Sequence, residues 1–279
     1  MHAKTILVCL TTPENSETLL KAAVPLARKH RAHLIGLHTI EALLVYPNIA
    51  MHIPGPAFAS FNQSQKEDSE KIKAIFTKYT TNEDFVSEFR LLRAEAVSAS
   101  ERMVESARSA DLVIMAHEDK ENDRYDQRQA QVQVIRESGR PVIVIPLGYD
   151  GPEIGSNIVL GWSDTREAAR AAHDMLSVVD DGANLTVLRV GATPQDAFKD
   201  ADAIDMVEMF ARHGLKTRLE HRDPIGDSIS DVLNDAAFDQ GADLIVTGAF
   251  GHSRAYDFVI GATSYALLRD LRVPVLFSK

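Results

Sequence analysis

The chain repeats one pattern of short apolar segments in its two halves. Three pairs of segments match in order: KTILVCL with SNIVLGW, SADLVIMA with GADLIVTGA, and GRPVIVIP with RVPVLFSK. The two aspartates of the middle pair, Asp111 and Asp243, are 132 positions apart (243 − 111). A duplication of this length predicts two copies of one fold in tandem. We place the domains at residues 1–147 and 148–279, joined by LGYDGPEIGS, whose Gly and Pro are typical of a linker.

Apolar segments alternate with helical periodicity along each half. In the second half we expect strands at 158–162, 185–190, 216–221, 244–247 and 273–277, and helices at 165–179, 197–213, 227–239 and 262–271. The strands are continuously apolar, which is typical of a parallel sheet covered by helices on both faces. The alternation therefore predicts an α/β protein of two tandem doubly wound parallel-sheet domains. The first half carries an insertion, residues 42–61, whose prolines and glycine predict a loop or lid.

Composition and charge exclude several kinds of partner. The net charge of −10 argues against nucleic acid and against anionic membrane surfaces, which both favour basic proteins. No apolar run approaches the roughly 20 residues that a membrane-spanning helix needs, and the N-terminus is too short for a signal peptide. We therefore expect a cytoplasmic protein. Its single cysteine, Cys9, lies in an apolar run and is expected to be a buried structural thiol.

Three glycines follow the apolar run 244–247 of the second half with the spacing Gly-x2-Gly-x9-Gly. Gly248 comes directly after the run, and Gly251 and Gly261 follow. Glycine permits a positive φ and lets a ligand approach the backbone closely. Gly261-Ala262-Thr263 opens an expected helix, whose first N–H groups attract phosphate. The pattern of strand, glycine loop and helix predicts a phosphate-binding site at the carboxyl end of the strand.

These residues resemble a known family. The segments GAFGHSR, IGAT and VPVL resemble the nucleotide-binding signature of universal stress proteins, and the resemblance covers the whole chain as two tandem family domains. It implies ATP, or else AMP or ADP, as ligand, with Mg²⁺ as an accompanying ion, and pairing of the domains through their last strands into an internal pseudo-dimer. The resemblance does not decide whether two chains also form a homodimer. The residues that it places at the nucleotide are Ser163, Val190, Gly248, Gly251, His252, Ser253, Gly261, Ala262 and Thr263.

The sequence departs from the family signature at two points. Ala262 stands where a hydroxyl residue is usual, so that the hydroxyl moves to Thr263. Ser163 occupies the place of the acid that many members carry after the first strand, and Asp164 follows it. A phosphate site made by backbone groups tolerates the alanine, whereas the adenosine contacts depend more on side chains.

The first half lacks the glycine loop. No glycine occurs between residues 56 and 138, and residues 118–128 contain five acids and three bases. We expect these side chains to obstruct phosphate and to repel it. The first domain is therefore interpreted as a degenerate, structural partner. We expect the chain to bind one nucleotide, in its second domain.

Two other functions remain open from the sequence. One is an interaction module that binds no nucleotide. The other is a hydrolase, because GHSRA at 251–255 resembles a nucleophile elbow around Ser253, although no partner acid and histidine follow in order. No dedicated base or arginine finger is evident, so any ATP hydrolysis would be slow and no catalytic or metal-binding residue is assigned. Trp162, at the end of a strand, is expected to pack in the core rather than stack on adenine.

Overall fold

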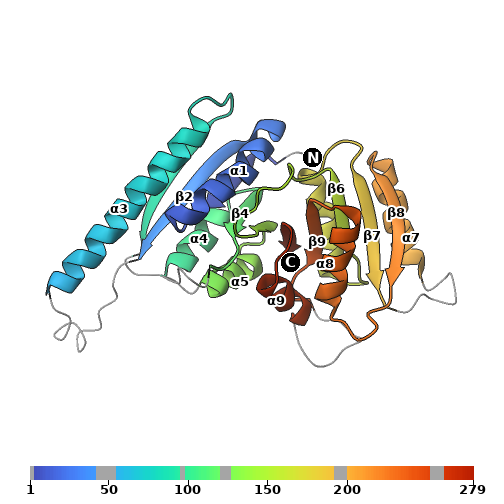
Figure 1. Ribbon diagram of the computed structural model, residues 1–279. Coiled ribbons are helices and arrows are strands. Elements are labelled where there is room, and N and C mark those ends of the chain that lie inside the picture. The colour runs from blue at the N-terminus through green and yellow to red at the C-terminus, as the bar shows by residue number, and fades with distance from the viewer. Residues whose placement is uncertain (1–2, 42–54, 95–97, 120–126, 192–199, 252–260) are drawn as a thin grey trace.

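The structure is a computed structural model that describes residues 3–41, 55–94, 98–119, 127–191, 200–251 and 261–279 (Figure 1). The strands are β1 (Thr5–Cys9), β2 (His33–Glu41), β3 (Ser87–Ala94), β4 (Leu112–Ala116), β5 (Val142–Ile145), β6 (Asn157–Gly161), β7 (Asn184–Val190), β8 (Lys216–Arg222), β9 (Leu244–Gly248) and β10 (Val275–Ser278). The helices are α1 (Pro13–His30), α3 (Gly55–Thr80), α4 (Ala99–Ala107), α5 (Gln127–Glu137), α6 (Arg166–Asp174), α7 (Ala201–Arg212), α8 (Ile229–Gln240) and α9 (Ala262–Arg269), and a 3₁₀ turn, Met175–Ser177, follows α6.

The described strands form one sheet in the order β3-β2-β1-β4-β5-β10-β9-β6-β7-β8. Each half contributes five neighbouring strands with the same internal order, and pairing within each half is parallel. The halves meet where β5 and β10 pair antiparallel, with Val144 opposite Val275 and Val142 opposite Phe277. The last strands therefore join the two domains, as the resemblance implied, and Figure 1 shows the domains side by side. The two-domain, doubly wound fold is confirmed.

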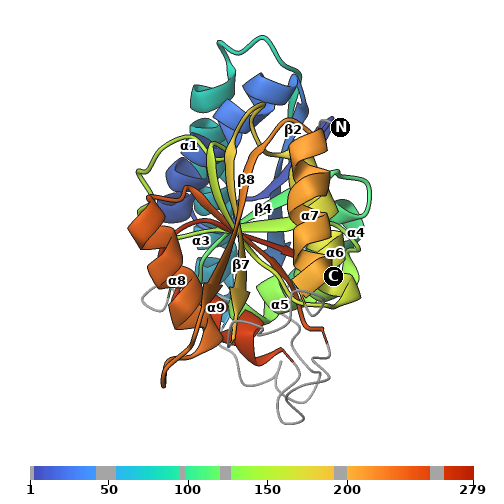
Figure 2. The same ribbon diagram turned by 90° about the vertical axis from the view of Figure 1, so that its right-hand side faces the viewer.

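Helices cover both faces of this sheet. One hydrophobic cluster includes Leu19 of α1, Ile72 of α3, Ala171 of α6 and Phe210 of α7. The other cluster is formed by side chains of α4, α5, α8 and α9 on the opposite side. Each cluster contains residues of both domains, so both faces of the sheet continue across the seam. The strands rotate progressively along the sheet and fan out in Figure 2, which is the usual twist of β-structure.

The duplicated aspartates fasten the start of the first strand in each domain. Asp111 Oδ2 accepts hydrogen bonds from the backbone N–H groups of Lys4 and Thr5 at 2.8 and 2.9 Å. Asp243 does the same more extensively. It is buried and accepts hydrogen bonds from the backbone of Gly155, Ser156 and Asn157 at 2.7–2.9 Å. The most evident sequence repeat therefore has a structural function.

The insertion in the first half differs from the expected loop. Residues 55–61 belong to α3, a helix of 26 residues, and residues 42–54 lie outside the described part. The loop prediction for 55–61 was wrong because Gly55 and Pro56 stand at the start of the helix. Proline is favoured in a first helical turn, where its missing N–H would have had no partner within the helix.

Candidate functional site

The three motif glycines lie between the end of β9 and the start of α9. Gly248 is the last residue of β9, and Gly261 is the N-cap residue of α9. The carboxyl ends of β6, β7 and β9 meet at the same edge of the sheet, and the strand order reverses between β6 and β9. Doubly wound sheets bind ligands at such an edge. The fold therefore places the glycine loop where a ligand site is expected.

Gly248 is required by the close approach of α6. A Cβ atom at this position would lie 2.5 Å from the backbone nitrogen of Ala168 and 2.5 Å from the carbonyl carbon of Glu167. Side chains essentially never approach backbone atoms so closely. Packing of α6 against β9 is thus sufficient to explain this glycine.

Glu167 brings a carboxylate to the glycine loop. A Cβ atom at Gly251 would lie 2.7 Å from Glu167 Oε2. The Glu167 side chain is 7% exposed, and its Oε1 lies 2.7 Å from Nε of Arg166. Sequence reasoning looked for an acid directly after the first strand and missed this one, which comes from the first turn of α6. A carboxylate here can accept hydrogen bonds from hydroxyl groups and would repel a phosphate placed beside it.

Gly261 opens α9 with a backbone conformation that suits glycine. Its φ is +81°, and a Cβ atom would lie 2.6 Å from Cδ1 of Phe250. Among the described residues, no side-chain cap accepts a hydrogen bond from the first N–H groups of α9. Ala262 is exposed and Thr263 half-buried in this first turn. These N–H groups and the helix dipole therefore form an uncompensated anion-attracting end.

Ser264 holds the loop to the helix. Its buried hydroxyl accepts a hydrogen bond from the backbone N–H of Phe250 at 3.1 Å. Phe250 itself has a φ of +53°, in the left-handed region, and its ring contacts Tyr265 edge to face, with 5.2 Å between centroids. Sequence reasoning missed Phe250 and Ser264 because nothing in the motif shows which way the residue between the glycines points.

Ser163 and Val190 lie at the same sheet edge as the glycines. Ser163 is exposed just beyond β6, with its hydroxyl 3.2 Å from that of Thr165. Val190 is the last residue of β7 and packs partly against the core. Two other site residues of the sequence analysis, His252 and Ser253, lie outside the described residues, as does the nucleophile interpretation of Ser253.

A polar network fixes the indole next to Ser163. Trp162 is buried, as expected, and its Nε1–H donates to Asp202 Oδ2 at 2.8 Å. Arg189 donates to Asp202 at 2.8 Å and to Asp200 at 2.6 Å, and Nε2 of His221 lies 3.0 Å from Asp200. Hydrogen bonding to Trp162 and Arg189 holds the pKa of Asp202 below its usual value despite burial, which opposes the shift. In the sequence, the sign of this polar network is Arg189, a charged residue within the mostly apolar strand β7.

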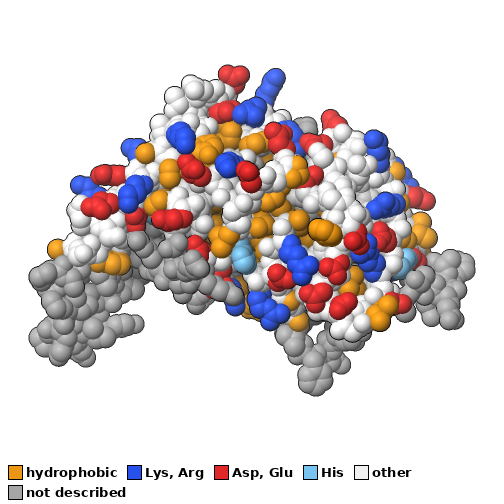
Figure 3. All heavy atoms as spheres, viewed as in Figure 1, with side chains coloured by type: hydrophobic (Ala, Val, Ile, Leu, Met, Phe, Trp, Pro, Cys, Tyr) orange, Lys and Arg blue, Asp and Glu red, His pale blue; other side chains and the backbone are white. Residues whose placement is uncertain are grey.

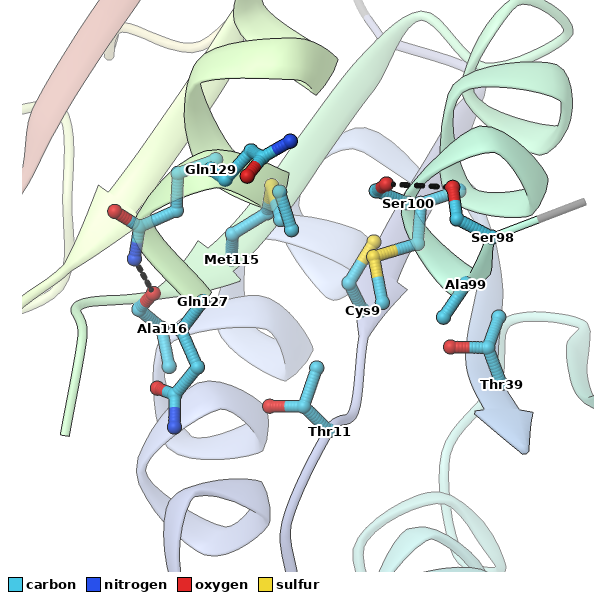
Figure 4. A pocket seen from close by; sticks show the side chains of 13 residues that line it. Cys9, Thr11, Thr39, Ser98, Ala99, Ser100, Met115, Ala116, Gln127 and Gln129 are labelled. Atoms are coloured by element: carbon cyan, nitrogen blue, oxygen red, sulfur yellow. Dashed lines mark hydrogen bonds between the residues drawn. The ribbon is translucent and has the colours of Figure 1, made fainter. Parts of the chain in front are cut away.

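The corresponding edge of the first domain contains a cavity of about 180 Å³ (Figure 4). Strand pairing gives the correspondence: Leu112 pairs with Ile6 as Leu244 pairs with Ile158, so Ala116 stands where Gly248 stands. The lining residues are Cys9, Thr11, Thr39, Ser98, Ala99, Ser100, Met103, Met115, Ala116, Gln127, Gln129, Ala130 and Gln131. The described residues of α4 and α5 leave space between their first turns, while most of the segment 118–128, which was expected to obstruct phosphate, lies outside the described residues.

The fold and the glycine loop define a protein of two doubly wound domains, one of which carries a loop suited to binding phosphate. The chain belongs to the universal stress protein family, whose model matches residues 2–146 and 156–279. No curated protein sequence matches the chain.

Two solved structures that match nearly the whole chain show the same fold. A universal stress protein from Archaeoglobus fulgidus DSM 4304 is similar over 98% of this chain and 96% of its own, with a TM-score of 0.73 and 16% identity. A Pseudomonas aeruginosa UCBPP-PA14 protein described as a universal stress protein is similar over 99% and 93%, with a TM-score of 0.60 and 17% identity. A shorter universal stress protein from Archaeoglobus fulgidus, solved in complex with dAMP, matches 52% of this chain and 98% of its own, with a TM-score of 0.35 and 17% identity.

Charged side chains of both signs are intermixed on the face shown in Figure 3. In the described part of the chain, no three or more His, Cys, Asp or Glu side chains are grouped so that they could hold a metal ion. Among the same residues, no helix combines the length and the apolar character that crossing a membrane requires.

Proposed function

We propose that the second domain binds ATP, or the related nucleotides AMP or ADP, at the glycine loop between β9 and α9. The observation that carries the proposal is the start of α9: Gly261 adopts a positive φ, and in the described part of the chain no side chain caps the first N–H groups. An uncapped helix start behind a glycine loop attracts phosphate. Membership of the universal stress protein family supports adenine nucleotide as the ligand.

Each site residue has a role in this proposal. Gly261, Ala262 and Thr263 offer backbone N–H groups and one hydroxyl to the phosphates, with His252 and Ser253 as further donors. Gly248 and Gly251 keep the loop close to α6, and Ser163 and Val190 face the adenosine part. The carboxylate of Glu167 lies beside Gly251, so we place the ribose hydroxyls there and the phosphates nearer α9.

The cellular role follows as part of the same proposal. A cytoplasmic protein of this kind would report nucleotide state in a stress response or in signalling. ATP would bring Mg²⁺ with it, and hydrolysis would be slow because no arginine finger or dedicated base is assigned. The pseudo-dimer is provided by the chain itself, and a further homodimer is not required.

The test replaces Gly261 by valine. A side chain there would meet Phe250 and would adopt a strained φ, so Gly261→Val should abolish ATP binding in calorimetric titration. Gly241→Val is the matched control. Gly241 also has a positive φ, +58°, but has no atom within 4 Å of its Cβ position and lies at the other end of the domain core, after α8.

A third variant separates the phosphate cradle from general damage. Ala262→Ser should bind ATP as tightly as the parent or up to about tenfold more tightly, because one added hydrogen bond contributes roughly 0.5–1.5 kcal/mol. Thermal unfolding shows whether each variant is folded. A folded Gly261→Val protein that binds ATP like the parent would place the nucleotide elsewhere or exclude it.

A further inference from the structure

We propose that the cavity of the first domain is a second binding site, which takes a neutral heteroaromatic molecule of about one ring. The cavity lies between the carboxyl ends of β1, β2 and β4 and the first turns of α4 and α5 (Figure 4). Its volume of about 180 Å³ sets the size of the ligand. An apolar protein cavity of about 150 Å³ accommodates benzene, so one ring with small substituents fits here.

The lining offers hydrogen bonds but no charge. Among the described residues, the lining contains no Lys, Arg, His, Asp or Glu. Its polar groups are the hydroxyls of Thr11, Thr39, Ser98 and Ser100 and the amides of Gln127, Gln129 and Gln131. The amides of Gln127 and Gln131 already bond with the backbone of Asp119 and Ala116, so the hydroxyls, which both donate and accept, are the groups that match a ring carrying N–H and C=O groups. A buried ionic ligand would find no counter-charge here and would lose its hydration.

Gln131 supplies an observation independent of cavity shape. The residue is 1% exposed, and its Nε2 donates to the carbonyl oxygen of Ala116 at 2.6 Å. Its Oε1 is buried and has no hydrogen-bond partner among the residues that the structure describes. Buried acceptors of this kind are rarely left unpaired in folded proteins. The oxygen is closed to water, so an N–H group of a bound ligand would reach it only after the Gln131 amide turned toward the cavity.

The charges around the cavity disfavour a phosphate. The N-terminus of α4 faces the cavity, but Glu101 already occupies it: its Oε2 accepts hydrogen bonds from the backbone N–H and the hydroxyl of Ser98 at 2.7 and 3.1 Å. Arg128, next to the lining glutamines, forms a salt bridge with Glu118. The carboxylates of Glu101 and Glu118 therefore disfavour an anion beside this cavity.

Sulfur atoms favour an aromatic ring over an aliphatic one. Cys9, Met103 and Met115 all line the cavity, and Cys9 and Met115 extend into it from neighbouring strands in Figure 4. Thioether sulfur makes favourable contacts with aromatic rings. Burial raises the pKa of the Cys9 thiol to about 12, so at neutral pH it is uncharged like the rest of the lining.

The test compares two molecules of nearly the same shape that differ in charge. Nicotinamide, with uracil as a second neutral probe, should bind the full chain in ligand-detected NMR with a dissociation constant on the order of 0.1–1 mM, which is typical of one-ring ligands. Nicotinate, the anionic counterpart of nicotinamide, should bind at least about tenfold more weakly. Saturating ATP should not displace the neutral probes, because the proposed nucleotide site lies in the other domain.

Two variants locate the site. Ala130→Leu fills the cavity from α5 and should abolish probe binding, whereas Ala211→Leu makes the same change at an exposed position of α7 and should not. Thr39→Val removes one buried hydroxyl without changing the shape of the side chain and should weaken probe binding about 2- to 10-fold. This variant keeps the proposal testable if Ala130→Leu does not fold. The proposal is overturned if neither neutral probe binds at about 10 mM, if nicotinate binds equally well, if ATP displaces the probes, or if folded Ala130→Leu binds like the parent.

Discussion

The guanidinium carbon of Arg136, in the last turn of α5, lies 5.4 Å from the centroid of the Phe250 ring in the glycine loop. The arginine belongs to the first domain and the phenylalanine to the second. His117, also of the first domain, lies 2.7 Å from the carbonyl oxygen of Leu268 in α9 through its Nε2. The first domain therefore contacts both the loop and the helix of the proposed nucleotide site.

Replacing Arg136 should weaken nucleotide binding without unfolding the protein. A cation over an aromatic face contributes about 0.5–1 kcal/mol at an exposed position, so Arg136→Gln should lower ATP affinity about 2- to 5-fold by loosening Phe250. Arg93→Gln removes the same charge from the edge strand β3 and serves as control. Calorimetric titration of both variants decides the matter. Equal ATP affinity in both would mean that Arg136 does not position the loop.

We expect one ATP per chain. The second domain has Gly248 at the end of β9 and Gly261 at the start of α9, whereas the first has Ala116 in the place of Gly248. Calorimetric titration should give a stoichiometry near one. A value near two would show that the first domain also accepts the nucleotide.

The two repeated aspartates should contribute unequally to stability. Asp243→Ala removes the acceptor of three backbone N–H groups, and Asp243 is buried, so the free energy of unfolding should fall by about 2–4 kcal/mol. Asp111→Ala removes two hydrogen bonds at an exposed position and should cost about 0.5–1.5 kcal/mol. Urea unfolding measures both. Equal losses of unfolding free energy in the two variants would contradict the larger contribution expected of Asp243.

His38 should make stability fall as the pH falls below about 6.5. Burial lowers the pKa of this imidazole, whereas its hydrogen bond to the carbonyl oxygen of Leu10 at 2.7 Å and the charge of Asp68 oppose the shift more weakly. Between the lowered folded pKa and the ordinary unfolded pKa, the unfolded chain binds more protons, so acid favours unfolding.

The comparison of two variants isolates this effect. His38→Gln should lose less unfolding free energy between pH 7 and pH 5 than the parent, while His213→Gln, at an exposed position after α7, should behave like the parent. Urea unfolding across this pH range gives the result. Identical slopes for the parent and His38→Gln would exclude a contribution of His38.

Much of the fold was predictable because hydrophobic periodicity shows which residues are buried. The duplication gave two domains, and Trp162 and Cys9 are buried as expected. The contacts of Glu167 and Phe250 at the loop were not predictable, because they depend on how α6 and α9 pack rather than on any local pattern. The cavity of the first domain was missed for the same reason: charges in the loop after β4 are visible in the sequence, but the spacing of α4 and α5 is not.

The antiparallel pairing of β5 with β10 has a consequence for how the two sites can change. In a symmetric dimer of identical subunits, every substitution occurs twice, and a residue that suits one site must suit the other. Here a single polypeptide provides both members of the pair, and the seam between Val144 and Val275 holds them together whichever residues stand at the carboxyl ends of β4 and β9. One copy can keep glycine at 248 while the other carries alanine at 116, so the two proposed sites are free to take different ligands.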